Sequence, residues 1–334
     1  MQHEASDQSD VAVVGAGPGG LFAAFYAGLR GMSVRLLEAL PFPGGQVAAL
    51  YPDKRIFDVG GFPAIRGAEL VTRLEQQARQ AHPTIHLQEA VTGLRREGAG
   101  FVLTTSADRA YRSRAVVLAV GIGRFRPRPF GVEAVDRWSG RGLTHTVTDA
   151  ARFAGQPVLV VGGGDSALDW AAELAEAGAA VTIVHRRAEF RGVESAVARA
   201  ESLGVRLRRA AVVDAVLGDA RQPHVALVRS LQTGELEEVP CAAVVLALGF
   251  EADLAFLRAW GIPLEGRSVV VSPDSMRVAD GIYAVGDAVA YPGKLRLIAS
   301  AFAEAALAIS ACKQALDPGA RFQAGHSSEL SPRP

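Results

Sequence analysis

The sequence predicts an α/β protein of two three-layer domains, with the second domain inserted into the first. Three observations support this prediction. The chain has 334 residues, which is long for a single core and suits two domains. A unit of strand, glycine turn, helix and strand near the N-terminus recurs in mid-chain, and a short apolar motif also occurs twice. Units repeated at a fixed offset indicate two domains of the same kind.

The first unit runs from Asp10 to Glu38, with apolar strands on either side of a glycine turn and an Ala-rich helix. Gly15 allows the tight turn, Gly17 lets the backbone approach a pyrophosphate, and Gly20 lets the helix pack on the strand. The N–H groups at the start of the helix can bind phosphate. Glu38 lies 23 residues after Gly15, where a carboxylate can accept a hydrogen bond from a ribose hydroxyl. This unit therefore predicts a dinucleotide site on a Rossmann-like domain.

The second unit repeats this pattern in mid-chain. A strand over Pro157–Val161 leads into a turn that begins at Gly162, and a helix and a second strand, Ala180–Val184, follow. Gly162 lies 147 residues after Gly15, and His185 lies 147 residues after Glu38. Strand, turn, helix and terminal position all agree, so we expect a second dinucleotide-binding domain.

The domain boundaries follow from the repeated apolar motif. Residues 115–121 read AVVLAVG, and residues 243–249 read AVVLALG. Each copy ends in glycine, and Gly and Pro residues follow the first copy, so each copy predicts a crossing between domains. We expect residues 1–120 and 250–334 to form the first domain and residues 121–249 to form the second. Further predicted elements are helices over 67–81 and 297–311 and strands over 85–88, 90–95, 101–105 and 115–120.

The two predicted sites differ in charge. The first ends in the carboxylate of Glu38, which suits a free ribose diol and repels a 2′-phosphate. The second ends in His185, Arg186 and Arg187, with Arg191 one turn further on. Guanidinium groups pair with phosphate in a bidentate fork, so the second site should prefer NADPH to NADH.

Composition narrows the functional classes. Lys plus Arg and Asp plus Glu both number 35, which argues against nucleic acid or an anionic membrane surface as a partner. The two cysteines, Cys241 and Cys312, form no CxxC motif and no metal cluster. The polar N-terminus lacks an apolar signal core, and the apolar helix over 297–311 is too short to span a bilayer. We therefore expect a cytoplasmic protein without a bound metal.

Four segments together resemble the thioredoxin-reductase-like flavoproteins: GAGPGG from Gly15, GGGDSA from Gly162, HRRAEFR from His185 and GIYAVGDA from Gly281. The resemblance implies FAD in the first domain and a contact of Asp287 with its ribityl–pyrophosphate region. Thioredoxin reductases carry a redox-active CxxC shortly before the second glycine motif. The corresponding positions here are residues 145–148, HTVT, so dithiol exchange cannot run there.

The sequence is more closely similar to the thioredoxin-reductase-like ferredoxin/flavodoxin–NADP⁺ reductases. Matching segments are YPDKRIFD from Tyr51, GFP from Gly61, GGGDSALDW from Gly162 and GHSS from Gly325. This family transfers a hydride from NADPH to FAD and then single electrons to the carrier. With the glycines above, the predicted FAD site is Gly15, Gly17, Pro18, Gly20, Glu38, Gln46, Tyr51, Val91, Phe125, Asp287 and Ser328. The predicted NADPH site is Gly162, Gly164, Asp165, Ser166, His185, Arg186, Arg187 and Arg191.

The resemblance also implies that Tyr51 and His326 stack on opposite faces of the flavin ring, with the tail crossing to the partner subunit of a homodimer. No residue is expected to act as a general acid or base. Seven cationic residues form either a docking patch for an acidic carrier or a scattered set: Lys54, Arg55, Arg124, Arg126, Arg128, Lys294 and Arg296. Two other functions remain open: an NADPH-dependent reductase of a quinone, ferric chelate or disulfide, and a flavin redox sensor.

Overall fold

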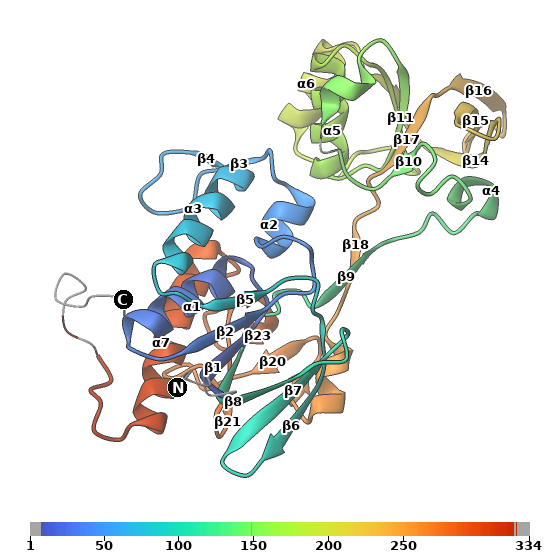
Figure 1. Cartoon of the computed structure of the whole chain (residues 1–334). Helices are drawn as coiled ribbons and strands as arrows, with labels where there is room; N and C mark the ends of the chain where they lie inside the picture. Colours follow the sequence, from blue (N-terminus) through green and yellow to red (C-terminus); the bar gives the residue numbers. More distant parts are fainter. Residues whose placement is uncertain (1–7, 148, 324, 326–334) are drawn as a thin grey trace. The chain divides into compact units, whose positions relative to one another are not determined.

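The computed structural model describes residues 8–147, 149–323 and 325, and the chain divides into two compact units (Figure 1). Unit 1 comprises Met1–Arg124 and Ala252–Pro334, and unit 2 comprises Phe125–Glu251. The chain passes between the units through β9 (Arg124–Pro127) and β18 (Phe250–Asp253), which pair with each other. Each unit contains a parallel sheet, so the fold class is α/β, as the sequence predicted.

The central sheet of unit 1 is parallel except at one side. Its order is β21-β22-β8-β1-β2-β5, with β1 (Gln8–Val14) between β8 (Ala110–Leu118) and β2 (Val34–Leu37). The outer strands are β5 (Thr84–His86), β22 (Ile282–Ala284) and the antiparallel β21 (Arg277–Ala279). Strands β6 (Val91–Glu97) and β7 (Gly100–Thr105) extend β8 as a meander. The central strands β1 and β8 contain continuous buried apolar runs, residues 11–14 and 115–118, as expected of parallel strands that are covered on both faces.

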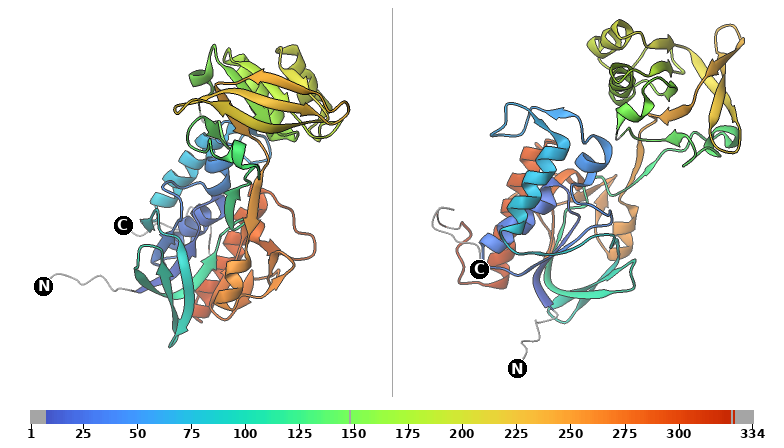
Figure 2. Two further views of the ribbon diagram at one scale, coloured as in Figure 1. Left: turned by 90° about the vertical axis from the view of Figure 1, so that its right-hand side faces the viewer. Right: turned by 45° about the horizontal axis from the view of Figure 1, so that its top comes forward.

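Helices α1 (Pro18–Leu29), α3 (Gly67–Arg79) and α7 (Ile298–Leu316) lie together on one face of this sheet (Figures 1 and 2). On α1, glycine and alanine make up most of the buried positions, which lets the helix lie close to β1 and α7. The remaining elements of unit 1 are α2 (Gly45–Leu50), β3 (Arg55–Ile56), β4 (Ile65–Arg66), η2 (Ala255–Trp260), β19 (Leu264–Glu265), β20 (Ser268–Val270), η3 (Gly286–Ala288) and β23 (Val289–Ala290).

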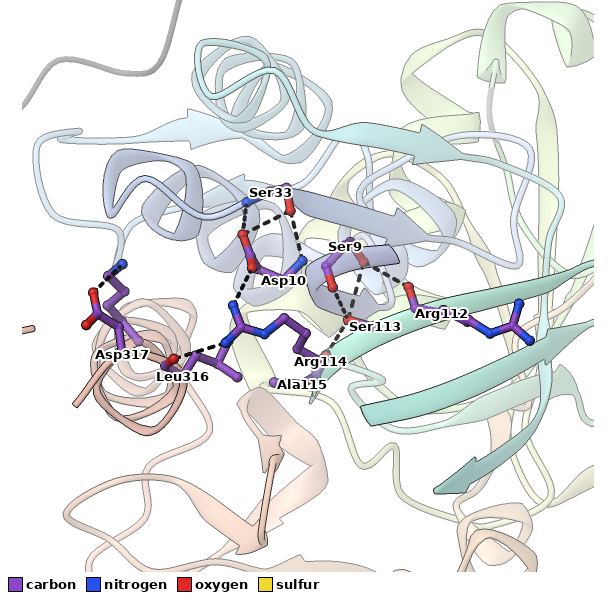
Figure 3. A network of polar contacts seen from close by, with 10 residues as sticks. Ser9, Asp10, Ser33, Arg112, Ser113, Arg114, Ala115, Leu316 and Asp317 are labelled. Carbon is purple, nitrogen blue, oxygen red and sulfur yellow. Dashed lines mark hydrogen bonds and ion pairs between the residues drawn. The ribbon is translucent and has the colours of Figure 1, made fainter. Parts of the chain in front are cut away.

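A polar network ties the end of α7 to the sheet (Figure 3). The Arg114 guanidinium on β8 donates to the Asp10 carboxylate at 2.9 Å and to the Leu316 carbonyl at 3.0 Å. Asp10 also accepts hydrogen bonds from the backbone N–H and the hydroxyl of Ser33 at 2.9 and 3.0 Å. Three segments far apart in the sequence are thus joined at one point: β1, β8 and the last turn of α7.

Unit 2 has a five-stranded parallel sheet in the order β10-β17-β11-β12-β13. The strands are β10 (Leu143–Thr144), β17 (Ala243–Leu246), β11 (Pro157–Val161), β12 (Ala180–Val184) and β13 (Arg206–Arg208). Helices α5 (Asp165–Glu176) and α6 (Glu194–Ser202) cover one face, and the meander β14 (Ala211–Gly218), β15 (Pro223–Ser230) and β16 (Leu236–Pro240) covers the other. Two short helices, α4 (Glu133–Asp136) and η1 (Ala150–Phe153), complete the unit.

Alternation along β11 explains the three layers of unit 2. Val158 and Val160 pack with the helices, whereas Leu159 and Val161 pack with the meander. Side chains of successive strand residues point to opposite faces, so one apolar run supplies both cores. The sequence predicted β11 and β12 with their observed bounds.

Several elements differ from the sequence-based expectation: the ends of α3, β5, β6 and β7 differ by one or two residues, and those of β8 and the last helix by more. The run 115–120 was expected to be strand throughout, but β8 ends at Leu118, where the chain turns against the first glycine loop. The last helix extends to Leu316 rather than ending at residue 311. The meander β14–β16 was not predicted, because polar residues interrupt its strands, as Asp214 does in β14 and Glu237 and Glu238 do in β16.

Candidate functional site

The first glycine turn has the geometry that its sequence predicts. A Cβ atom on Gly15, whose φ is +101°, would lie 2.5 Å from the Ala119 carbonyl oxygen. A Cβ on Gly20 would lie only 1.9 Å from the Gly15 carbonyl oxygen. A Cβ on Gly17 would instead meet no atom within 4 Å. Two glycines are therefore required by packing, while Gly17 leaves an open space at the start of α1, next to Pro18 at its first turn.

The carboxylate of Glu38 reaches back to this turn from the end of β2. It is 6% exposed and accepts hydrogen bonds from the backbone N–H of Ala16 at 2.6 Å and of Leu40 at 2.9 Å. Burial raises the pKa of Glu38, and these backbone hydrogen bonds oppose the rise. A carboxylate has about four acceptor positions, so acceptor capacity remains for a ligand hydroxyl.

Helix α2 closes over the same turn. The backbone N–H of Gly44 donates to the Ala16 carbonyl at 2.7 Å, and a Cβ on Gly45 would lie 3.0 Å from Cα of Gly17. Gln46, in the first turn of α2, donates from Nε2 to the Asp287 carboxylate at 3.3 Å. Residues from three distant parts of the sequence, Gly17, Gln46 and Asp287, thus lie around one space.

Tyr51 caps the C-terminal end of α2 and is half-buried. Burial, followed by the negative charges of Asp287 and Asp58, raises the pKa of Tyr51. A shallow pocket of about 400 Å³ is lined by Tyr51, Lys54, Arg55, Ile56, Phe57 and Asp58. The Phe57 side chain is 70% exposed beside it. This loop therefore presents an aromatic surface next to Asp287.

Glu38 is also held from the side of β5. Its N–H donates to the His86 carbonyl at 2.9 Å, and its carbonyl accepts from Glu89 N–H at 2.8 Å. The Glu89 carboxylate, 2% exposed, accepts from the Tyr111 hydroxyl at 3.0 and 3.1 Å and pairs with Arg109. Val91, at the start of β6, is 6% exposed in the core just beyond this network.

Three predicted flavin contacts cannot be placed. His326 and Ser328 lie outside the described residues, and Phe125 lies in β9, where its side chain is not described. The other predicted contacts of the first site lie in unit 1, with Glu38, Gln46 and Asp287 around the glycine turn.

The glycine turn of unit 2 is built on the same plan. A Cβ on Gly162 would lie 2.5 Å from the Ala247 carbonyl oxygen, and a Cβ on Gly163 would lie 2.2 Å from Nδ1 of His185. A Cβ on Gly164, the N-cap of α5, would meet only the Arg191 guanidinium, at 4.0 Å. Gly164 therefore leaves the open position here, as Gly17 does in unit 1.

His185 differs from the two arginines that follow it. Its ring is 6% exposed, lies under Gly163 and stacks on Phe190 with a centroid distance of 5.2 Å. Burial, together with nearby arginine charges, lowers the pKa of His185 despite a backbone hydrogen bond. Arg186 and Arg187 are exposed, so they present their charges to solvent.

Two hydrogen bonds tie the following loop to the turn. The N–H of Arg191 donates to the Gly163 carbonyl at 2.7 Å, and the N–H of Val193 donates to Oδ1 of Asp165 at 3.0 Å. They hold the Arg191 side chain beside Gly164, close to the exposed Ser166 in the first turn of α5. A guanidinium group thus lies at the second turn, whereas carboxylates lie at the first.

The set of seven candidate docking cations does not form one surface patch. The Lys294 side chain is 7% exposed and pairs with the buried Glu304. Lys54, Arg55, Arg128 and Arg296 are exposed, and the side chains of Arg124 and Arg126 are not described. Lys294 is therefore unavailable to a protein partner, and its burial could not be predicted from the residues around it.

Both cysteines are unpaired and fully buried, at 0% exposed. Burial raises the thiol pKa of Cys241 and of Cys312 to about 12. Within the described residues, no three His, Cys, Asp or Glu side chains are arranged to hold a metal ion. No helix in the same part of the chain is long and apolar enough to cross a bilayer.

Comparisons with known proteins agree with this geometry. Residues 9–305 match the family described as pyridine nucleotide-disulphide oxidoreductase. The ferredoxin–NADP reductase of Saccharopolyspora erythraea is 46% identical over 96% of this chain and 97% of its own length. That of Geobacillus thermodenitrificans is 41% identical over 96% and 97%.

Solved structures give the same result for the fold. Thioredoxin reductase from T. acidophilum superposes with a TM-score of 0.77 at 26% identity, covering 92% of this chain and 99% of that one. The Lactococcus lactis enzyme gives a TM-score of 0.75 at 28% identity over 92% and 99%. The chain therefore belongs to the pyridine nucleotide-disulphide oxidoreductase family and is a homologue of the curated ferredoxin–NADP reductases.

Proposed function

We propose that this protein is an FAD-dependent ferredoxin–NADP⁺ reductase, with flavodoxin as an alternative carrier. The observation that carries the proposal is the contrast between two glycine turns. The Glu38 and Asp287 carboxylates lie at the first, and the Arg191 guanidinium lies at the second, where the exposed Arg186 and Arg187 follow the buried His185. The first suits a dinucleotide with free ribose hydroxyls, and the second suits one with a 2′-phosphate. Both curated relatives named above are ferredoxin–NADP reductases.

The residues of unit 1 fit FAD. The open side of Gly17 admits a pyrophosphate, and Glu38 retains free acceptor positions for a ribose. Gln46 and Asp287 supply an amide and a carboxylate next to that space. The chemistry that FAD supplies when bound is acceptance of two electrons as a hydride and their delivery one at a time. The chain itself binds and orients the cofactor. Tyr51 is proposed to cover one face of its ring, with His326 of the partner subunit on the other.

Unit 2 is proposed to bind NADPH, with the pyrophosphate at Gly164 and the 2′-phosphate at Arg186, Arg187 and Arg191. His185 supports the turn from beneath, because its ring occupies the space left by Gly163. Asp165 and Ser166 begin α5, where Asp165 fixes the arginine loop through Val193.

We also propose a homodimer in the cytoplasm. Phe22, Phe25 and Tyr26 on α1 and Phe302 on α7 form an aromatic cluster that remains partly exposed, with the Phe22 and Phe302 centroids 5.1 Å apart. Partly exposed aromatic clusters are typical of protein interfaces. Sedimentation velocity of the wild type and of a Phe25→Ser variant tests this. A monomeric wild type would rule out the dimer.

The test of the proposed function is anaerobic. NADPH should bleach the absorbance of the bound flavin, and the reduced protein should then transfer electrons to ferredoxins or flavodoxins faster than to quinones, ferric chelates or disulfides. Faster reduction of a small acceptor would favour the alternative reductase. Failure of NADPH to bleach the flavin would favour a redox sensor.

A further inference from the structure

Helix α7 buries one carboxylate among mainly apolar side chains. Glu304 is 2% exposed and accepts hydrogen bonds from the N–H of Gly286 and the hydroxyl of Tyr291, both at 2.7 Å. It also forms an ion pair with Lys294, whose side chain is 7% exposed. Burial and the neighbouring Glu304 raise the pKa of Tyr291 to about 12, so its hydroxyl remains a donor.

A buried ion pair of this kind is poorly explained by stability alone. Removing two charges from water is expensive, and well-packed apolar side chains at such sites are often equally stable. Breaking such a pair at one partner is strongly destabilising, because the other charge is left buried. The reason for the pair must therefore lie in what its atoms hold in place.

Glu304 holds the turn that carries Asp287. The hydrogen bond from Gly286 fixes a backbone in the left-handed region, with φ of +80°, one residue before Asp287. Tyr291 and Lys294 belong to the segment between this turn and α7, so the same carboxylate holds both the turn and the middle of the segment. Asp287 in turn accepts the hydrogen bond from Gln46 at 3.3 Å.

We propose that Glu304 and Lys294 form a buried positioning pair that holds the turn at Gly286 and Asp287 in the conformation that binds FAD. Glu304 supplies the acceptor for Gly286 N–H, and Lys294 neutralises the charge of that acceptor. Both act through Asp287 and are positioning residues. The inference rests on the proposed function only in taking FAD as the ligand of unit 1.

Two double variants isolate the acceptor. Lys294→Met with Glu304→Gln removes both charges but leaves an amide oxygen that accepts from Gly286. Lys294→Met with Glu304→Met removes the charges and the acceptor while keeping a similar volume. The purified holoproteins are diluted in steps, and released FAD is measured by its fluorescence. Visible absorbance spectra and melting temperatures are recorded on the same samples.

The Gln double variant should retain FAD within about threefold of the wild type and keep its spectrum. The Met double variant should release FAD at least tenfold more readily, with a shifted spectrum. Equal FAD retention and equal spectra in the two double variants would overturn the proposal. Loss of FAD in the Gln variant to the same extent as in the Met variant would also overturn it.

A single variant answers the question if the Met double variant does not fold. Glu304→Asp keeps the charge beside Lys294 but withdraws the acceptor from Gly286 by one methylene. It should fold, with FAD release raised about tenfold, and wild-type retention of FAD would refute the positioning role. None of these measurements uses ferredoxin. If the wild type bound FAD but reduced no carrier, the proposed function would fail and the positioning pair would stand.

Discussion

Replacing Arg186 and Arg187 together by glutamine should convert a strong preference for NADPH into a weak one. Both side chains are exposed, and within the described part of the chain neither forms an ion pair. Their guanidinium groups thus have no internal partner to lose when a phosphate binds. We therefore expect the double variant to fold as the wild type does.

A hydrogen bond to a charged group contributes roughly 1.5–3 kcal/mol. Because both side chains are exposed, the lower figure applies, which is about tenfold in affinity for each arginine. The double variant should lose about 100-fold in kcat/KM for NADPH and less than threefold for NADH. The loss should shrink at high ionic strength, where the phosphate is screened.

The assay is stopped-flow reduction of the bound flavin by each nucleotide, without any carrier. Arg199→Gln is the matched control: Arg199 is an exposed arginine of unit 2 whose partner is Glu176, at 2.8 Å. In the control variant, kcat/KM for NADPH and for NADH should change alike and by less than twofold. Equal losses for NADPH and NADH in the double variant would show that Arg186 and Arg187 do not bind the 2′-phosphate.

Three further predictions concern the first glycine turn, the two thiols and the polar network of Arg114 at the end of α7. Gly17→Ala should fold but weaken FAD binding at least tenfold, and tight FAD binding by this variant would contradict the proposed pyrophosphate site. Gly20→Ala should fail to fold, because its Cβ would lie 1.9 Å from the Gly15 carbonyl oxygen. The Cys241→Ala, Cys312→Ala double variant should keep its activity. The raised thiol pKa values add stability that is complete below pH 9 and lost as the pH rises toward 12, so this variant should lose less stability than the wild type in alkaline melts. Arg114→Met should lower the free energy of unfolding by about 1 kcal/mol in urea titrations at pH 7 (Figure 3). Burial alone would raise the pKa of Asp10, but hydrogen bonds from Ser33 and Arg114 outweigh this effect and lower it. The difference in unfolding free energy between the wild type and Arg114→Met should therefore narrow as the pH falls below 4 and Asp10 becomes protonated.

The sequence predicted the elements whose signals are local. Strands β11 and β12 have the predicted bounds, because a parallel strand covered on both faces is an almost continuous apolar run. The glycine turns could also be predicted from the sequence, since the backbone approaches Gly15 and Gly162 so closely that no side chain fits there. The position of Glu38 followed from the fixed length of strand, turn and helix.

The contacts of Glu304 could not be predicted in this way. In the sequence it is one acid in an apolar helix, and Lys294 is one cation in a loop rich in Gly and Pro. Their pairing depends on how residues 286–297 fold back over α7, and such a tertiary contact leaves no periodic pattern in the sequence. The Glu89 network could not be predicted for the same reason, since Tyr111 lies on β8 and Arg109 directly precedes that strand.

The residue that follows the second strand of each dinucleotide-binding unit, Glu38 after β2 and His185 after β12, has a different role in the two units. This difference explains how one local fold serves two ligands. In unit 1 the Glu38 carboxylate both accepts from the turn and retains acceptor positions for a ligand. In unit 2 the equivalent His185 fills the space under Gly163. Because its ring is used for packing, the charge that selects the nucleotide is supplied by the next two residues, Arg186 and Arg187. Replacing His185 by glutamate would therefore not create an NADH site, because a buried carboxylate there would face three arginines and leave their exposed charge in place.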